Sequence, residues 1–483
     1  MKNTNLVYGV NDKPGLWKTL IFAFQQVLAI LAATIVVPVI INNSTESQMS
    51  QSAALLGAGV GTIVYLLFTK FKSPVFLGSS FAFIGSMCAA FSGAASASAG
   101  YLGLIIGAIL AGLVYVVIAL VVKLAGVKWI DKVMPATVIG PTVAIIGLSL
   151  STNAVGDLFK GSVLAPVEEF IINSKGAPEL VTNFYPTANS WLCLLCGLVT
   201  LAVVIVCSVY GKKMMKIIPF IIGIAAGYLL ATIFTVIGHL TENTALQIIN
   251  FKLFENMVWL PEFTFVEAFK GVKDIDGAFI GTIAVAYVPV AFVVFAEHLA
   301  DHKNISSIIG EDLLENPGLH RTLLGDGVGS MVGAFFGGCP NTTYGESVGC
   351  VAISGNASVV TILTAVIICI VSAFFAPLMT LLATIPSCVM GGVCMSLYGF
   401  IAVSGLKMIQ KVDLNKNHNL FTVSVILIAG VGGMVLNIGK ITITSIACAL
   451  ILGILANFLT SKASKEEQTA EQATEEVAEE KVA

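Results

Sequence analysis

Long apolar runs without charge alternate with short polar stretches along almost the whole chain. No Asp, Glu, Lys or Arg occurs in residues 19–45, 73–122, 180–211, 217–241, 277–296, 347–406 or 441–461. A helix that crosses a bilayer needs about 20 mostly apolar residues, so the longest runs must each hold two or three spans. The pattern therefore predicts an all-α polytopic membrane protein.

Division of these runs at charges and turn residues predicts about fourteen transmembrane segments. The first seven cover approximately 17–41, 51–69, 74–93, 101–122, 134–152, 190–210 and 217–239. The second seven cover approximately 277–300, 321–338, 340–353, 357–377, 381–405, 419–438 and 442–460. An N-terminal segment at 1–16 and a tail at 461–483 remain, and longer loops are expected at 153–189 and 240–275.

Composition supports a membrane protein and excludes several other classes. Hydrophobic residues make up 57% of the chain and charged residues 11%, against about 45–50% and about 25% in soluble domains. A secreted disulfide protein, a nucleic-acid binder and a soluble enzyme are excluded. The net charge of −3 reflects the tail, whose seven Glu and three Lys predict a disordered, solvated segment.

Basic residues gather in alternate loops between the predicted segments. They are Lys2, Lys13, Lys18, Lys70, Lys72, Lys123, Lys128, Lys132, Lys212, Lys213, Lys216, Lys303, Arg321, Lys407, Lys411 and Lys416. The short loops at 42–50 and 94–100 carry no Lys or Arg, whereas the longer loops at 153–189 and 240–275 contain some Lys but are expected to be external, because long loops escape the charge rule. Because Lys and Arg favour the cytoplasmic side, we expect a multi-pass protein of the cell membrane with both termini in the cytoplasm.

A weak internal repeat relates the two halves of the chain. Residues 134–140 (MPATVIG) are similar to 385–391 (IPSCVMG), and residues 24–29 (FQQVLA) to 295–300 (FAEHLA). Both matches are offset by seven segments, an odd number, so the halves must have opposite orientations. The sequence thus predicts two inverted repeats, at 17–240 and 277–460, a plan typical of secondary transporters.

Two predicted segments are poor helices. They contain residues 73–83 (SPVFLGSSFAF) and 337–346 (GGCPNTTYGE), and each is the third segment of its half. Non-helical backbone at membrane depth must be buried in protein or line a cavity. The N-terminus of a half-helix there attracts carbonyl oxygens and anions. A re-entrant kink without a ligand is the alternative, but the equivalent positions of the two breaks favour a binding site.

Ionisable residues at membrane depth mark the same region. Glu297 follows 20 uncharged residues, and Asp301 lies one turn later on the same helix face. His298 and His302 form a second pair on an adjacent face. Glu346 ends the second break. Such residues usually face a bundle interior and mark substrate or proton paths, although a hydrogen bond that ties two helices together is an alternative.

Other polar residues have structural explanations at this stage. Asp326 follows Arg321 by five residues and is expected to pair near the membrane interface. Most of the ten Cys lie in apolar runs and are expected to be small buried side chains. Cys193 and Cys196 form a C-x-x-C on a predicted span without a nearby His, so we expect no metal and no cofactor.

Four sequence strings resemble the nucleobase–cation symporter-2 family (nucleobase–ascorbate transporters), and within it the bacterial uracil permeases. They are residues 77–83 (LGSSFAF), 296–298 (AEH), 316–321 (NPGLHR) and 340–346 (PNTTYGE). The last string is the most specific, because it is long, polar and set in a membrane. The resemblance covers nearly all of residues 8–460.

The resemblance implies a fold and a mode of action. It implies fourteen spans in two inverted repeats, with short antiparallel strands in segments three and ten that meet at the substrate. Segments 1–4 and 8–11 would form a core domain, and segments 5–7 and 12–14 a gate domain. A transporter of this kind takes up uracil with protons as the coupling ion, and commonly forms a homodimer through its gate domain.

The resemblance also implies a substrate site. The backbone amides of Phe81 and Gly345 would donate to uracil carbonyls, and Glu297 and Glu346 would accept from ring N–H groups. A planar ring with alternating donors and acceptors suits this arrangement. Two aromatic residues would lie nearby, Tyr344 and Tyr398. Proton coupling is expected from Glu297, Asp301, His298 and Glu346.

Three positions depart from the family pattern. Asp301 stands where some relatives carry His, so proton coupling is expected to run through a carboxylate. Ser347 stands where Asn often follows the second Glu, which is expected to alter ring selectivity. Gln26, which matches Glu297 in the repeat, stands where some relatives carry His.

Three alternatives remain open at the level of sequence. The first is a proton-coupled permease of the same family for purines such as xanthine or uric acid. The second is an anion carrier or channel with the same architecture, which two carboxylates at membrane depth disfavour. The third is an integral membrane enzyme, which is not expected because the sequence contains neither a metal-ligand cluster nor an activated nucleophile.

Overall fold

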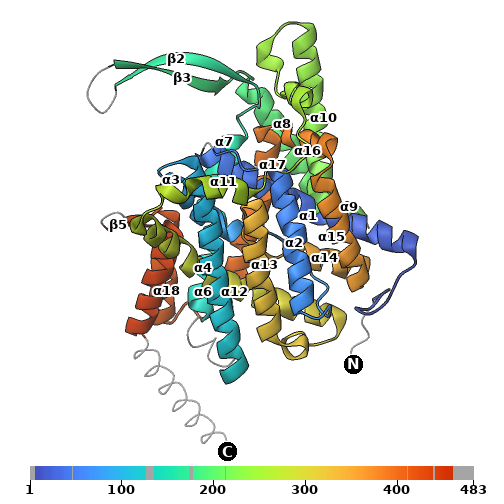
Figure 1. The fold of residues 1–483 in the computed structure, drawn as a ribbon, viewed down its shortest axis with the longest axis vertical. Helices are drawn as coiled ribbons and strands as arrows, with labels where there is room; N and C mark the ends of the chain where they lie inside the picture. The colour runs from blue at the N-terminus through green and yellow to red at the C-terminus, as the bar shows by residue number, and fades with distance from the viewer. Residues whose placement is uncertain are drawn as a thin grey trace, which may run out of the picture.

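The computed structural model describes residues 6–45, 47–126, 135–172, 178–212, 214–410, 412–438 and 441–460 of the 483-residue chain. The acidic tail and the first residue of the fifth predicted segment lie outside these ranges. Long helices dominate the structure and run side by side through the body of the molecule (Figure 1). The prediction of a mainly helical protein with several apolar spans is confirmed.

The first half of the chain contains helices α1 (Leu16–Thr45), α2 (Gln51–Phe68), α3 (Ile84–Ser92), α4 (Ala97–Ala125), α6 (Ala136–Ser149), α7 (Ser151–Asp157), α8 (Ser190–Tyr210), α9 (Met214–Ile217) and α10 (Pro219–Leu240). It also contains strands β1 (Leu77–Ser79), β2 (Leu164–Ile172) and β3 (Pro178–Pro186), and a 3-10 turn η1 (Phe81–Phe83). Short turns η2 (Thr244–Leu246) and η3 (Phe251–Asn256) lead into the second half.

The second half contains helices α11 (Thr264–Lys270), α12 (Gly277–Ile309), α13 (Leu319–Gly337), α14 (Gly345–Ser354), α15 (Val359–Ala373), α16 (Ala376–Ala383), α17 (Ser387–Ile409) and α18 (Asn417–Val431). Its strands are β4 (Asn341–Thr343), β5 (Leu436–Ile438) and β6 (Ile441–Ile443), and its short turns are η4 (Gly271–Asp274) and η5 (Leu314–Gly318). A last helix covers Ser445–Thr460.

Side-chain caps explain where several long helices begin. Ser50 accepts from the amide of Ala53 at the start of α2, and Asp276 accepts from the amide of Phe279 at the start of α12. These bonds satisfy amides that have no partner within the helix. The helix α12 ends at Gly310, which adopts a left-handed conformation with φ of 74°. Local sequence therefore sets both ends of the helix that carries most of the candidate residues.

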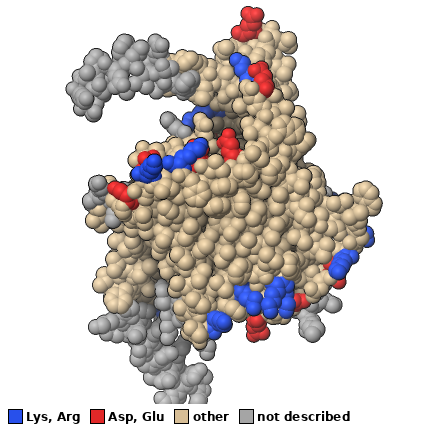
Figure 2. Space-filling view, viewed as in Figure 1, with Lys and Arg blue, Asp and Glu red and all other residues tan. Residues whose placement is uncertain are grey.

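Eight helices within the described residues are long and apolar enough to cross a membrane. They are α1, α2, α4, α6 together with α7, α8, α10, α12 and α17. The pair α15 and α16 is bent by 79° at its junction and forms a further broken span or a re-entrant segment. Figure 2 shows charged side chains at two opposite ends of the molecule, with a broad uncharged band between them. Such a band suits a lipid environment.

The helices pack as two bundles. In the first bundle, α13 packs against α2 and α4, α12 packs against α4, and α15 packs against α1 and α2. In the second bundle, α17 packs against α6 and α8, α10 packs against α8, and α18 packs against α6. The helices α1, α12 and α14 make the smaller contacts that join the bundles. The space between the bundles is therefore bordered by elements from distant parts of the sequence.

Glycine allows close helix contact inside each bundle. A Cβ atom at Gly57 of α2 would lie 2.4 Å from the carbonyl oxygen of Gly333 in α13. In the second bundle, a Cβ atom at Gly147 of α6 would lie 2.3 Å from the carbonyl oxygen of Tyr398 in α17. Small residues at helix contacts let backbones approach and pack without a hydrophobic driving force in lipid.

The two predicted breaks form paired strands. Strand β1 pairs antiparallel with β4, with Leu77 opposite Thr343 and Ser79 opposite Asn341. All six strand residues are buried. This pairing satisfies backbone groups that lipid could not satisfy, and it confirms the short strands expected in segments three and ten.

Two regions differ from the predicted fold. The expected loop at 153–189 contains the end of α7 and a hairpin in which β2 pairs antiparallel with β3. The expected helical segments at 419–438 and 442–460 meet in the antiparallel pair β5–β6. Apolar periodicity does not distinguish a short β-pair from the end of an apolar helix, which explains the second difference.

Candidate functional site

The paired strands place two helix N-termini at one point. The turn η1 begins at Phe81, two residues after β1, and continues into α3. Helix α14 begins at Gly345, two residues after β4. The first amides of a helix have no carbonyl partner four residues earlier, and they carry the positive end of the helix dipole. Both starts therefore present N–H donors beside the strands.

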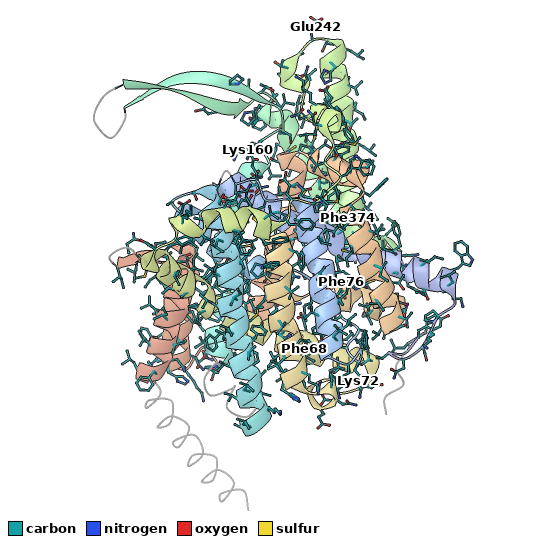
Figure 3. All side chains as sticks on the ribbon, in the orientation of Figure 1. Phe68, Lys72, Phe76, Lys160, Glu242 and Phe374 are labelled. Carbon is teal, nitrogen blue, oxygen red and sulfur yellow. The ribbon has the colours of Figure 1, made fainter. Side chains whose placement is uncertain are left out.

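This point lies deep in the molecule. Lys72 lies at one end of the molecule and Glu242 at the opposite end (Figure 3). Phe76, which directly precedes β1, lies between them in this view and is fully buried. The chain thus turns back into the interior after Lys72 and reaches mid-depth where the strands pair.

A cavity with a volume of about 430 Å³ opens beside the two half-helices. Phe81 of η1, Glu297 and Asp301 of α12, and Gly345 and Glu346 of α14 line it. Its opposite wall comes from the second bundle, through residues of α6, α10 and α17. The volume lies within the range of about 300–1,000 Å³ that is usual for small-molecule sites.

Acidic side chains give the cavity its polarity. Glu297 is exposed although it lies inside the molecule, because its carboxylate faces the cavity. Asp301 and Glu346 are half-buried in the same wall. The lining also includes a basic residue, Lys216 of α9. Among the described residues, no group of three His, Cys, Asp or Glu has an arrangement that could hold a metal ion.

A hydrogen bond links an acid of this wall to the strand pair. The hydroxyl of Thr343 in β4 donates to Asp301 Oδ2 over 3.1 Å. Tyr344 follows in sequence, is 3% exposed, and donates its hydroxyl to the carbonyl oxygen of Ser79 over 2.8 Å. Its ring occupies the space beside Gly78, where a Cβ atom would lie 2.3 Å from two ring carbons. Tyr344 therefore supports the strand pair as well as lining the cavity.

His298 lies on the adjacent face of α12 and does not line the cavity. It is fully buried, and its Nδ1 lies 2.7 Å from Oδ2 of Asp326 in α13. Its Nε2 lies 3.0 Å from the Thr322 hydroxyl. The prediction that Asp326 pairs near the membrane interface is wrong, since this carboxylate is 1% exposed and bonds His298 instead of Arg321. The prediction failed because it relied on the short sequence distance between Asp326 and Arg321, whereas α13 directs the Asp326 side chain towards His298 of α12.

His302 extends this buried network. Its ring stacks on that of His298 at 3.9 Å, and its Nδ1 donates to the His298 carbonyl over 2.8 Å. Its Nε2 lies 2.7 Å from the hydroxyl oxygen of Tyr65 in α2. The Tyr65 hydroxyl lies 2.6 Å from Ser73 Oγ. The inner face of α12 is thus bonded to α2 and α13 by buried polar groups.

Two further residues singled out from the sequence lie behind the cavity wall. Tyr398 of α17 is 2% exposed, and its ring centroid lies 6.3 Å from that of Phe81. Ser347 is fully buried, accepts from the side-chain amide of Gln26, and accepts from the Phe76 amide over 3.0 Å. Ser347 thus ties α1 and the start of the first break to α14, and it does not line the cavity.

Comparisons with known proteins agree with this arrangement. A profile described as the permease family matches residues 17–439. The uracil permease of Bacillus subtilis (strain 168) is 36% identical over 476 residues, which cover 98% of this chain and 99% of that protein. The uracil permease of Escherichia coli (strain K12) is 33% identical, over 93% of each chain. This chain belongs to the nucleobase–cation symporter-2 permease family.

Solved structures of more distant transporters share the fold of this symporter-2 permease. The transmembrane domain of a cyanobacterial bicarbonate transporter, BicA, aligns with a TM-score of 0.57 at 15% identity, over 92% of this chain and 98% of that one. Murine Slc26a9, an anion transporter in the inward-facing state, aligns with a TM-score of 0.60 at 14% identity, over 94% of this chain and 69% of that one. The likeness concerns the fold alone.

Sequence reasoning missed the wall that the second bundle contributes to this permease's cavity. Val143 of α6, Phe220 of α10, and Phe400 and Ser404 of α17 line it. These residues lie in apolar runs like many others, so hydropathy carries no signal for them. Lys216 was visible only as one of several basic loop residues. Lys216 lies three positions before Pro219, at the start of an apolar run. This position is the local signal that could have identified Lys216 as a cavity residue.

Proposed function

We propose that this permease is a proton-coupled uracil uptake symporter of the cell membrane that works by alternating access. The observation that carries the proposal is the convergence of two carboxylates and two half-helix N-termini on one cavity between two bundles. The curated relatives named uracil permease, at 33–37% identity over nearly the whole chain, support uracil as the substrate.

The donor and acceptor pattern of uracil fits the groups around the cavity. In this proposal, the amides of Phe81 and Gly345 donate to the two ring carbonyls, and Glu297 and Glu346 accept from the ring N–H groups. Each such group left unpaired in a dry site costs about 1–3 kcal/mol. The site should therefore discriminate strongly against analogues that lack an N–H group. Tyr344 supports the strands, and Tyr398 supports the ring of Phe81.

Proton coupling is assigned to Glu297, Asp301 and Glu346, which all line the cavity. Asp301 bonds Thr343, so its state of protonation is linked to the strand that leads into α14. His298 acts from the inner face of α12 by fixing the rotation of that helix. Entry of one proton adds about 2.3 kcal/mol per 100 mV of membrane potential.

The proposed architecture has fourteen spans in two inverted repeats of seven. The equivalent strand and half-helix pairs, β1 with α3 and β4 with α14, support this repeat. The first bundle then corresponds to the core domain and the second bundle to the gate domain. Both termini lie in the cytoplasm in this proposal, because the basic loops are cytoplasmic. Two copies associate through their gate domains.

Alternating access requires that one side of the cavity be closed. On one side, the cavity extends to Met408 in the last turn of α17. Near the other side, α1 and α7 meet through Asn153, which donates to Ser44 Oγ over 3.2 Å, and Asn43, which donates to Asp157 Oδ2 over 3.5 Å. We assign these bonds to the outer closure of an inward-facing state, and they must break when the outer side opens.

A purine permease is the second candidate function. A Cβ atom at Gly345 or Gly349 would meet nothing within 4 Å, so this wall of the cavity leaves open space. That space favours a larger ring system. An anion carrier is disfavoured, since three carboxylates and one Lys line the cavity. Competition of labelled uracil uptake by unlabelled xanthine and uric acid distinguishes uracil from purine transport.

The experiment that tests the proposal is uptake of labelled uracil into proteoliposomes with an imposed pH gradient. Wild-type protein should accumulate uracil, and accumulation should stop when a protonophore collapses the gradient. Glu297→Gln and Glu346→Gln keep the shape of each side chain but remove an acceptor, so each should abolish uptake. Glu242→Gln, on an exposed residue far from the cavity, is the matched control. Uptake that survives both substitutions contradicts the site.

A further inference from the structure

A second, much smaller cavity lies behind the candidate site, inside the first bundle. Its volume is about 10 Å³. Tyr115 of α4, Asp326 of α13 and Asn341 of β4 line it, together with Phe83 and Ser330. A buried site needs about 10–15 Å³ to hold one water molecule, and such a water usually makes two to four hydrogen bonds to polar groups.

Three side-chain oxygens of this cavity's lining residues have no hydrogen-bond partner among the residues that the structure describes. They are the hydroxyl of Tyr115, Oδ1 of Asp326 and Oδ1 of Asn341, on side chains that are 4%, 1% and 3% exposed. The second polar atom of the Asp326 side chain and that of the Asn341 side chain each have a partner. Asp326 Oδ2 bonds His298 over 2.7 Å, and the Asn341 amide nitrogen donates to the carbonyl of Gly57 over 2.9 Å. Buried polar groups are costly unless they are bonded.

We infer that this cavity is a binding site for one ordered water molecule. The water donates one hydrogen to Asp326 Oδ1 and one to Asn341 Oδ1, and it accepts from the Tyr115 hydroxyl. This pattern matches two acceptors and one donor, because Asp326 Oδ1 and Asn341 Oδ1 accept, whereas the Tyr115 phenol donates. Three lining oxygens, one of them on a donor, give a water three hydrogen bonds, the usual number for a buried water, and would leave a bare cation with few ligands.

The water would connect the buried network to the substrate strand. Asn341 is the first residue of β4, and Thr343 at the end of this strand bonds Asp301 in the large cavity. Asp326 belongs to the network that holds the inner face of α12 through His298. The bridging water joins α4, α13 and β4 behind the two half-helices. Tyr115 and Asn341 are thereby positioning residues that fix the strand without touching the substrate.

A pair of tyrosine variants tests this site by the sign of their effects. Tyr287 is fully buried and has an unpartnered hydroxyl within the described residues, but it does not line this cavity. Removal of an unbonded buried hydroxyl is neutral or stabilising, whereas removal of a bonded one is destabilising. Tyr115→Phe should lower the apparent Tm of the full chain in detergent by roughly 1 °C, and Tyr287→Phe should leave it unchanged or raise it. A neutral or stabilising Tyr115→Phe would overturn the water site.

Three further measurements test the water site and separate it from the proposed function. The Tm test does not depend on the substrate, so it stands even if uracil is not transported. If uracil is the substrate, Tyr115→Phe should weaken its binding several-fold and Tyr287→Phe should not. Wild-type Tm should be the same in sodium and choline salts, and stabilisation by sodium that Tyr115→Phe removes would show that the cavity binds a cation.

A high-resolution experimental map should contain one density peak within hydrogen-bond distance of the three oxygens, and an empty cavity would also overturn the inference.

Discussion

The two faces of helix α12 carry similar residues in very different surroundings. Glu297 and Asp301, four residues apart, face the large cavity between the bundles. His298 and His302, also four residues apart, face the dry interior of the first bundle and are fully buried. One helix therefore carries an acidic face that lines the cavity and a face whose His side chains bond other helices. Consecutive residues of the sequence, Glu297 and His298, belong to these two faces.

The comparison shows that the partners of a polar residue decide its role. Each imidazole on the inner face has protein partners, through Asp326, Thr322 and Tyr65. On the outer face, Glu297 is exposed to the cavity, and Asp301 has a bond to Thr343. We therefore expect inner-face changes to act mainly on stability and outer-face changes to act mainly on transport.

The largest effect is expected when the inner-face pair is broken. Asp326→Ala leaves the buried Nδ1 of His298 without its partner, and an unsatisfied buried polar group costs about 1–3 kcal/mol, more where a charged group is involved. The protein should express poorly or unfold at much lower temperature in detergent. Size-exclusion chromatography and thermal unfolding check this outcome. Asp301→Ala on the outer face is the matched control, and equal loss of stability in both variants would contradict the comparison.

A smaller effect is expected from the proton-linked acid of the outer face. Asp301→Asn keeps the size of the side chain and removes its ability to release a proton. Proton entry supplies about 2.3 kcal/mol at 100 mV, so the variant should lose a concentration gradient of roughly 50-fold. Uracil exchange across proteoliposomes without a gradient should continue. Accumulation at the wild-type level, measured at the same membrane potential of about 100 mV, would show that Asp301 takes no part in proton coupling.

The smallest effect is expected at the bond between the strand and the acid. Thr343→Val removes the hydroxyl that donates to Asp301, a bond worth about 0.5–1.5 kcal/mol. The initial rate of uracil uptake should fall a few-fold, and its dependence on pH should shift because Asp301 loses a partner. Thr142→Val is the control, since that buried hydroxyl of α6 donates only within its own helix in the described contacts. An unchanged pH profile would contradict a link between β4 and coupling.

Much of this arrangement could be predicted from the sequence. The two breaks at 73–83 and 337–346 are visible because Pro, Gly and Ser interrupt otherwise apolar runs, and the structure pairs them as β1 and β4. Spacing by four residues places Glu297 with Asp301, and His298 with His302, on separate helix faces. These predictions succeed because they depend on local geometry.

Contacts between distant segments could not be predicted in this way. Asp326 and Ser347 are buried by helices that lie far away in sequence, so nothing next to them reveals their partners. Phe220 and Phe400 line the cavity only because the second bundle faces the first. The β2–β3 hairpin was missed because polar and β-favouring residues alternate there too weakly to distinguish a hairpin from a loop.

An experimental structure of the permease with uracil tests the central claim most directly. The account predicts one uracil in the 430 Å³ cavity, with its ring N–H groups bonded to Glu297 and Glu346 and its carbonyls bonded to the amides of Phe81 and Gly345. Uracil bound elsewhere, or a cavity without uracil at a saturating concentration, would contradict it.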